Sequence, residues 1–235
     1  MKKCAVLWFF AACFTLLSLS LSPSAFSSEP VATVREPKAN YPRSAAERDK
    51  ASDPQQVSGS INRCLKYWPQ VIRESRYHVG MDAPAHDFMG QIETESNCTA
   101  SVTGITGDIG LGQFQPGTAR WLQSKEKALQ QISVKAQPQN PRWAIRALIL
   151  YDKYLYDNVS CTDWHYAFRA YNGGMQTIDN EIKKAGSCDY KAVEAKCRRR
   201  IMKTTNGHLD FCKVNIGYPY KIRAAGKKYQ AVSVQ

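Results

Sequence analysis

The segment over residues 88–96 contains the side chain best suited to acid catalysis. A helix turns about 100° per residue, so Ile92 lies about 40° from Phe88 around the axis and Glu95 about 20° away on the other side. Glu93 lies about 140° from Phe88, on the side expected to face solvent. Burial disfavours a charged carboxyl group, so Glu95 on the apolar face would hold its proton near neutral pH, as a general acid must. A buried structural glutamate would give the same pattern, and the spacing alone leaves both interpretations open.

A glycine-rich segment begins at Gly107, twelve residues after Glu95, and runs to Ala119. Glycines let the backbone approach a ligand closely, and the Gln113 amide offers both a donor and an acceptor to a polar ligand such as a sugar. The segment also contains Asp108, a second carboxylate. These residue types favour a binding loop next to the acid.

Two further positions combine a tyrosine with a polar neighbour or a turn. Tyr171 and Asn172 precede Gly173-Gly174 at a predicted helix C-terminus, and Tyr218 lies in Asn215-Ile216-Gly217-Tyr218-Pro219, close to a predicted turn. Tyrosine can stack on a sugar ring, and asparagine can hydrogen-bond an amide. Each tyrosine could equally pack in a core with its hydroxyl at the surface.

The elements that must position these residues are predicted to be helices. Apolar residues recur at helical spacing, and proline or a capping residue precedes several of the stretches. Long strands with strict alternation are not expected. The predicted helices cover residues 82–96, residues 118–129, a longer stretch from Pro141, and a stretch from Thr162 or Asp163 to Gly173. Residues 104–117 are expected to form a loop. The fold class is therefore mainly α.

The order and spacing of these motifs resemble the soluble lytic transglycosylase family, which is akin in fold to goose-type lysozyme. The resemblance spans roughly residues 85–222. Glu95-Ser96 matches the catalytic Glu-Ser of that family, Gly110-Leu111-Gly112-Gln113 its Gly-Leu-Met-Gln, Ala170-Tyr171-Asn172 its Ala-Tyr-Asn, and Tyr218 its final tyrosine. Gly112 stands where the family usually has methionine, which predicts a wider or more mobile subsite.

The resemblance implies a lysozyme-like single domain with the Gly-rich loop in an active-site cleft. It implies cleavage of the β-1,4 bond between N-acetylmuramic acid and N-acetylglucosamine in peptidoglycan glycan strands, leaving a 1,6-anhydromuramoyl end. Glu95 would be the catalytic acid. Ser96, Gln113, Tyr171, Asn172 and Tyr218 would bind substrate, and Tyr218 would also orient Glu95. No metal or cofactor is expected, since the four histidines are scattered and no cysteines are spaced as CxxC.

Two alternatives stay open. Asp108 could activate water as a second carboxylate, which would make the protein a hydrolytic muramidase. The chain could also be a non-catalytic peptidoglycan-binding scaffold component. Its size and its export signal raise the further hypothesis that it serves an envelope-spanning secretion or conjugation apparatus.

The N-terminus predicts export. Lys2 and Lys3 precede an apolar run over residues 5–21, and small residues follow up to a cleavage point near Ser27. We expect a signal peptide over residues 1–27, a flexible linker over 28–60, a lysozyme-like domain over 61–228 and a tail over 229–235. An uncleaved membrane anchor is the alternative. Cleavage would leave the mature protein without a stable membrane span. We therefore expect the mature protein in the periplasm or outside the cell.

Cysteine usage and charge agree with export. Six cysteines follow the predicted signal, an even number that predicts disulfides, although the sequence cannot choose among 15 pairings. The formal charge is +12, and the chain from Lys183 onward has thirteen Lys and Arg against three Asp and Glu. Such a surface attracts an anionic polymer. Peptidoglycan, with its peptide carboxylates, fits an exported protein better than nucleic acid does, and a solvated basic face without a dedicated partner remains open.

Overall fold

The described part of the chain is built almost entirely of helices. The structure is a computed structural model that describes residues 54–104, 106–198, 200–204 and 207–230, all within one compact unit, Lys50–Gln235. The predicted signal peptide, most of the predicted linker and most of the predicted tail lie outside the described residues. No described helix is long and apolar enough to cross a bilayer.

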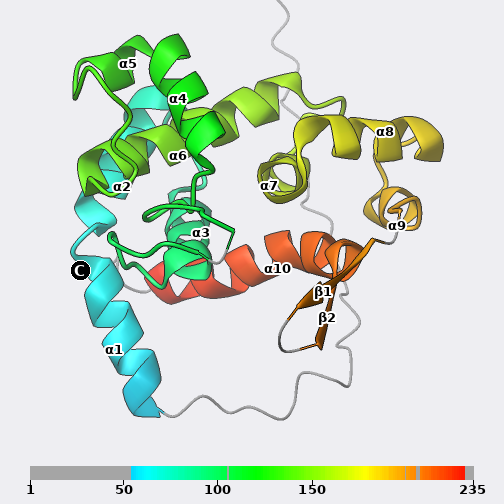
Figure 1. Cartoon of the computed structure of the whole chain (residues 1–235), viewed down its shortest axis with the longest axis horizontal. Helices are drawn as coiled ribbons and strands as arrows, with labels where there is room; N and C mark the ends of the chain where they lie inside the picture. Colours follow the sequence, from blue (N-terminus) through cyan, green and yellow to red (C-terminus); the bar gives the residue numbers. More distant parts are fainter. Residues whose placement is uncertain (1–53, 105, 199, 205–206, 231–235) are drawn as a thin grey trace, which may run out of the picture. The chain divides into compact units, whose positions relative to one another are not determined.

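The elements follow one another as shown in Figure 1. The helices are α1 (Pro54–Leu65), α2 (Trp68–His78), α3 (Ala85–Ser96), α4 (Pro116–Lys125), α5 (Lys127–Gln130), α6 (Pro141–Asn158), α7 (Trp164–Gly173), α8 (Met175–Ala185), α9 (Tyr190–Glu194) and α10 (Phe211–Gln230). A short antiparallel hairpin of β1 (Ile201–Thr204) and β2 (Gly207–Asp210) precedes α10 and pairs Ile201 with Asp210.

The predicted fold class is confirmed, and several helix ends follow the expected capping chemistry. Asp163 caps α7 by accepting a 2.7 Å hydrogen bond from the backbone N–H of His165, and Gly174 ends the helix with φ 85°. Pro141 opens α6, and the Asn140 side chain accepts from the backbone N–H of Arg142 at 3.0 Å. These local signals explain why α6 and α7 were predictable.

Three predicted boundaries differ from the structure. The helix expected over residues 118–129 is two helices, because Glu126 adopts an extended backbone (φ −99°, ψ 103°) between α4 and α5. Helix α1 begins at Pro54, inside the predicted linker. Tyr229, placed in the predicted tail, is fully buried in α10. The end of α10 depends on a long-range contact, the hydrogen bond from Tyr229 to Glu93, that the local sequence does not show.

Gly217 and Pro219 predict a turn close to Tyr218, but the structure has no turn there. Tyr218 lies inside α10, a helix of 20 residues that carries Pro219 in its interior. Proline there removes one helix hydrogen bond, and packing must compensate for that loss. The compensation comes from the extensive contact that α10 makes with α3 (Figure 1).

The crossing of α3 and α10 brings two helix backbones into contact. A Cβ atom added at Gly90 would lie 2.2 Å from the carbonyl oxygen of Ile222, and one added at Gly226 would lie 2.7 Å from that of His86. No larger residue fits at either position without moving a backbone. The two glycines therefore fix how closely α10 approaches α3.

Glu93 strengthens the same crossing, and the prediction that it faces solvent is wrong. Its carboxylate accepts hydrogen bonds from Lys228 Nζ and from the Tyr229 hydroxyl, each at 2.7 Å, and its side chain is only 10% exposed. The helical periodicity of α3 cannot reveal that a second helix covers this side.

All six cysteines that follow the predicted signal are paired. Cys64–Cys98 joins α1 to the chain just after α3, Cys161–Cys188 joins the start of α7 to the end of α8, and Cys197–Cys212 joins the hairpin region to the first turn of α10. Each bond closes a loop and restricts the unfolded chain. The disulfides predicted from the cysteine count are confirmed.

Candidate active site

Glu95 lies in the last turn of α3 and lines a cleft of about 380 Å³. Loss of water around the carboxyl group is the largest influence and raises its pKa to about 7. A hydrogen bond from Tyr218 lowers the pKa in part, and the negative charge of Asp108 raises it. A large fraction of Glu95 side chains therefore carry a proton at neutral pH, while the carboxylate form remains accessible.

Tyr218 approaches Glu95 from α10. Its side chain is 5% exposed, and its hydroxyl donates a hydrogen bond to Glu95 Oε1. Burial raises the pKa of this hydroxyl well above its usual value, so it remains a donor. When Glu95 is neutral, its Oε1 accepts from Tyr218 and its acidic proton is carried by Oε2. The close α3–α10 crossing thus also orients the acid.

The Gly-rich loop forms another wall of the cleft. Backbone hydrogen bonds close it on itself, from Gly104 N–H to the Asp108 carbonyl at 2.8 Å and from Gly110 N–H to the Val102 carbonyl at 2.9 Å. Gly110 has φ 77°, and a Cβ atom there would lie 1.8 Å from the carbonyl oxygen of Pro138. Only glycine allows this approach, which fixes the loop against the segment before α6.

Both carboxylate oxygens of Asp108 are held within the loop. Oδ2 accepts from the Thr106 hydroxyl, and Oδ1 accepts from Gln115 Nε2. All three residues line the cleft, as Glu95 does. Asp108 thus contributes a fixed negative charge to the cleft, and its hydrogen bonds are made by neighbouring protein groups.

Gln113 lines the cleft, and its side-chain nitrogen is used by the loop. Nε2 donates to the Gly110 carbonyl at 2.9 Å and to the Val102 carbonyl at 3.4 Å. Its backbone has φ 46°, an uncommon conformation for a residue other than glycine. Gln113, which is predicted to bind substrate, therefore also stabilises the Gly-rich loop.

The space beside Gly112 is filled, in contrast to the wider subsite that the glycine predicted. The Tyr171 hydroxyl donates to the Gly112 carbonyl at 2.6 Å. A Cβ atom at Gly112 would meet the Phe114 ring at 2.7 Å and the Tyr171 hydroxyl at 2.9 Å. Glycine at position 112 therefore leaves room for Tyr171 of α7 to hydrogen-bond the backbone of the loop.

Asn172 is exposed and lines the cleft, and its side chain is hydrogen-bonded by Asn215 of α10. Asn215 Nδ2 donates to Asn172 Oδ1 at 3.2 Å and to the Arg169 carbonyl at 2.8 Å. A Cβ atom at Gly173 would lie 2.5 Å from Asn215 Nδ2, which explains the glycine after Asn172.

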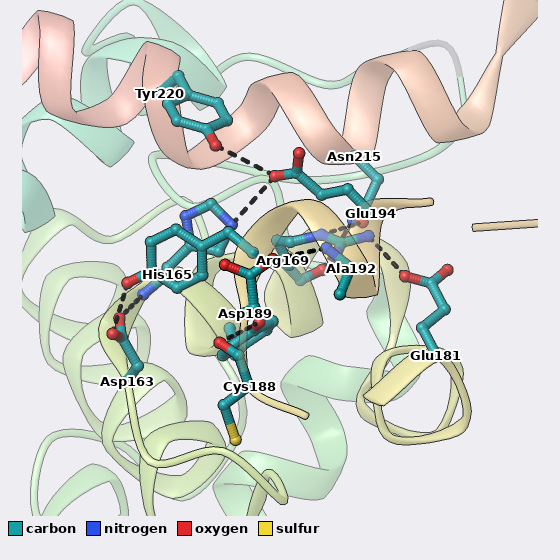
Figure 2. A network of polar contacts seen from close by, with 12 residues as sticks. Asp163, His165, Arg169, Glu181, Cys188, Asp189, Ala192, Glu194, Asn215 and Tyr220 are labelled. Carbon is teal, nitrogen blue, oxygen red and sulfur yellow. Dashed lines mark hydrogen bonds and ion pairs between the residues drawn. The ribbon is translucent and has the colours of Figure 1, made fainter. Parts of the chain in front are cut away.

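Figure 2 shows that Arg169 links Asn215 to Glu181. Its Nε donates to Asn215 Oδ1 at 3.0 Å, and its Nη2 donates to Glu181 Oε2 at 2.6 Å. Arg169 is fully buried, and Glu181 is 4% exposed. A buried charge is tolerated when it is paired and hydrogen-bonded, and this pair ties α7 to α8 and α10.

The structure brings together four of the six predicted site residues along the cleft, namely Glu95, Gln113, Tyr171 and Asn172. Tyr218 lies next to them through its bond to Glu95. Ser96 does not line the cleft: it is 5% exposed, and its hydroxyl donates to the Ile92 carbonyl of its own helix at 3.0 Å.

A second buried acid lies near Glu95. Asp152 of α6 is fully buried, and loss of water raises its pKa well above the usual value. Gln91 Nε2 donates to Asp152 Oδ1 at 3.4 Å, while Asp152 Oδ2 and Gln91 Oε1 have no hydrogen-bond partner within the described part of the chain. Full burial disfavours a charge on this carboxyl group, so we assign Asp152 as neutral. This acid was not predicted, because Asp152 lies on a predicted helix with no motif around it.

Other cleft residues were also missed. Thr118, Tyr151 and Phe211 also line the cleft. Tyr151 lies on α6, and the helical spacing of apolar residues cannot show which of them reaches a cleft. Phe211 carries no signal, because it is the first residue of α10 after a hairpin that was not predicted. In the described ranges, no three His, Cys, Asp or Glu side chains gather closely enough to hold a metal ion.

Comparison with known families identifies the central part of this chain. The model of the transglycosylase SLT domain matches residues 83–193, which include α3, the Gly-rich loop and α4 to α8. A comparison with curated proteins finds no match. The hairpin and α10, with Tyr218 and Asn215, lie beyond the matched residues.

Proposed function

Residues 83–193 are a transglycosylase SLT domain of the lysozyme-like lytic transglycosylase family, and on that premise we propose that the protein is a lytic transglycosylase of peptidoglycan. The bond cleaved is the β-1,4 bond between N-acetylmuramic acid and N-acetylglucosamine. The observation that carries the proposal is Glu95, whose pKa lies near 7 in a cleft where Tyr218 orients its carboxyl group.

Glu95 acts first as an acid and then as a base. Its proton passes to the glycosidic oxygen as the bond from that oxygen to C1 of the muramoyl residue breaks. The resulting carboxylate accepts the proton of the muramoyl 6-hydroxyl while the oxygen of that hydroxyl bonds to C1. The product is a 1,6-anhydro sugar, no water is consumed, and Glu95 regains its proton. A pKa near 7 suits both steps, because neither protonation state is costly at neutral pH.

The hydrolytic alternative is weaker. A hydrolase needs a second carboxylate that is free to activate a water molecule or to attack the sugar. Asp108 is the carboxylate that shares the cleft with Glu95, and both of its oxygens already accept hydrogen bonds from Thr106 and Gln115. We therefore assign Asp108 an electrostatic role, in which its charge favours the protonated form of Glu95.

The three disulfides indicate an oxidising compartment, which fits a protein that acts on peptidoglycan in the periplasm or outside the cell. A scaffold would need no acid with a raised pKa, and Glu95 therefore favours an enzyme over a scaffold. The hypothesis of an envelope-spanning secretion or conjugation apparatus as partner gains no support from the family match.

Mass spectrometry of muropeptides released from purified sacculi tests the proposal. The wild-type protein should release products with 1,6-anhydromuramoyl ends. Glu95→Gln should lower the rate about 10²- to 10⁴-fold, because the amide cannot donate a proton as an acid does.

Glu93→Gln is the matched control. It makes the same change two residues earlier on α3, at a carboxylate that binds α10 instead of lining the cleft. It should keep most of the activity. Products with a reducing muramic acid end, or equal activity of wild-type protein and Glu95→Gln, would contradict the proposal.

A further inference from the structure

A second hollow adjoins the catalytic cleft. It has a volume of about 370 Å³, and it shares Asn172 and Phe211 with the cleft. Four of its lining residues are exposed cations, namely Lys184, Lys196, Arg198 and Arg200. We call this feature the basic hollow. A glycan strand in the cleft would therefore pass beside a concentrated positive charge.

Separate segments of the chain converge to build the basic hollow. Lys184 lies in the last turn of α8, and Lys196 follows α9. Arg198 and Arg200 lie in the segment between α9 and β1. The Cys197–Cys212 disulfide ties this last segment to α10. The cations are thus held together by the fold and are not one run of charge along a single helix.

Helix α9, which precedes Lys196, is itself fastened to its neighbours (Figure 2). The carboxylate of Glu194 accepts from the Tyr220 hydroxyl of α10 at 3.1 Å and lies 3.4 Å from His165 Nε2 of α7. The wall that carries Lys196 therefore has a defined position relative to α7 and α10.

The positive charge of the basic hollow is not neutralised from within. Glu181 is the acidic residue in its lining, and the Glu181 carboxylate is paired with buried Arg169. No ion pair between described residues involves any of the four cations, and Arg200 stacks its guanidinium over the Phe211 ring, 5.2 Å from the centroid. Clustered cations that lack acidic partners favour an anionic ligand.

We infer that the basic hollow binds the carboxylates of the peptide attached to the glycan strand, while the strand itself occupies the cleft. The inference rests on the proposed function, since it takes peptidoglycan as the substrate. Carboxylates form strong hydrogen bonds with guanidinium and ammonium groups. The exposed amide side chains of Asn172 and Asn180 line the same space and suit the peptide backbone. The enzyme therefore prefers strands that still carry peptides.

Binding of soluble glycan strands tests this inference independently of cleavage. All proteins carry Glu95→Gln to prevent turnover, and each is titrated with strands that keep their peptides and with strands freed of them by an amidase. The Glu95→Gln protein should bind peptide-bearing strands about tenfold more tightly. Adding Lys184→Gln and Arg198→Gln should lower that ratio to about threefold, because the two changes remove two of the four cations that line the basic hollow. Raising the salt concentration should also reduce the ratio.

The charge-matched control is Lys183→Gln with Lys191→Gln, which removes two neighbouring exposed lysines outside the hollow. It should keep the tenfold ratio. The inference would be overturned if the Lys184→Gln/Arg198→Gln protein kept the affinity ratio of its parent. It would also be overturned if the control lowered that ratio as much as Lys184→Gln/Arg198→Gln does. Failure of the proposed function would instead be seen as absent anhydro products from wild-type protein, whatever the binding ratios.

Discussion

The two walls of the cleft are built in different ways. The wall that carries Glu95 consists of two helices whose backbones touch at Gly90 and Gly226, and its side chains are buried. The other wall is a loop that is held by its own backbone hydrogen bonds and by Tyr171 at Gly112. The reactive group thus lies on the wall that is fixed by packing, and the loop wall supplies shape and one charge.

This division explains how a single carboxyl group can be both acidic and well oriented. The helical wall removes water from Glu95 and holds one of its oxygens through Tyr218, while the loop wall adds the charge of Asp108. The three influences do not act in one direction. Burial and Asp108 raise the pKa of Glu95, and Tyr218 lowers it. Loss of the Tyr218 hydroxyl and loss of the Asp108 charge should therefore shift the pH profile in opposite directions.

The largest effect is expected from breaking the helical wall. Gly90→Ala places a methyl group 2.2 Å from the carbonyl oxygen of Ile222, so α10 must move away from α3. We expect a loss of about 3 kcal/mol in the free energy of unfolding, and a loss of activity as Tyr218 leaves Glu95. Urea unfolding and the rate of muropeptide release measure the two quantities.

Gly217→Ala is the control for that change. Gly217 also lies within α10, but a Cβ atom there has no neighbour within 4 Å. Alanine should leave stability unchanged or raise it by up to about 1 kcal/mol, because alanine is the better helix former. Equal stabilities of the two variants would mean that the close crossing does not hold the helical wall together.

The next effect concerns the pH dependence of stability. The pKa of Glu95 is raised from 4.5 to about 7, so folding favours the protonated form. Its contribution to stability is full below about pH 4.5 and is lost as the pH rises through 7. Between pH 4.5 and 8, wild-type protein should therefore lose roughly 2–3 kcal/mol relative to Glu95→Gln, which has no proton to lose. Parallel stability curves of the two proteins would contradict the raised pKa.

Tyr218→Phe should have a smaller effect. Without the hydroxyl, the carboxyl of Glu95 loses the hydrogen bond that lowers its pKa, and the basic limb of the activity profile should move to higher pH. The maximal rate should fall about tenfold, the value of one hydrogen bond to a charged group. Steady-state rates from pH 5 to 9 provide the test, and a basic limb that moves to lower pH would contradict it.

The smallest effect is expected on the loop wall. Asp108→Asn removes the negative charge that raises the pKa of Glu95, so the basic limb should move to lower pH, opposite to Tyr218→Phe. The rate at pH 7 should fall only about two- to fivefold, since one nearby charge contributes modestly to the barrier. The products should keep their anhydro ends. Complete loss of activity would indicate that Asp108 takes part in the reaction.

The same division separates what the sequence predicted from what it did not. Glu95 was predictable because helical spacing places it beside Phe88 and Ile92, and α6 and α7 were predictable from Pro141 and Asp163 at their starts. Tyr218 was identified only through its family resemblance, because Gly217 and Pro219 suggest a turn. Its helix exists because of contacts with α3, more than 120 residues earlier.

Features that depend on distant contacts were missed or misjudged. Glu93 was expected to face solvent because Lys228 and Tyr229 are remote in sequence. Asp152 has no motif around it, and its burial follows from how α6 packs. The basic C-terminal region was visible as composition, but its convergence around a hollow required the fold and the Cys197–Cys212 bond.

Cleavage of purified sacculi in water enriched in ¹⁸O tests the central claim most directly. If Glu95 alone transfers the proton and the muramoyl 6-hydroxyl attacks C1, the released muropeptides carry 1,6-anhydro ends without ¹⁸O. Incorporation of one ¹⁸O atom at a reducing muramic acid end would mean that water attacks C1, and would contradict the single-carboxyl mechanism.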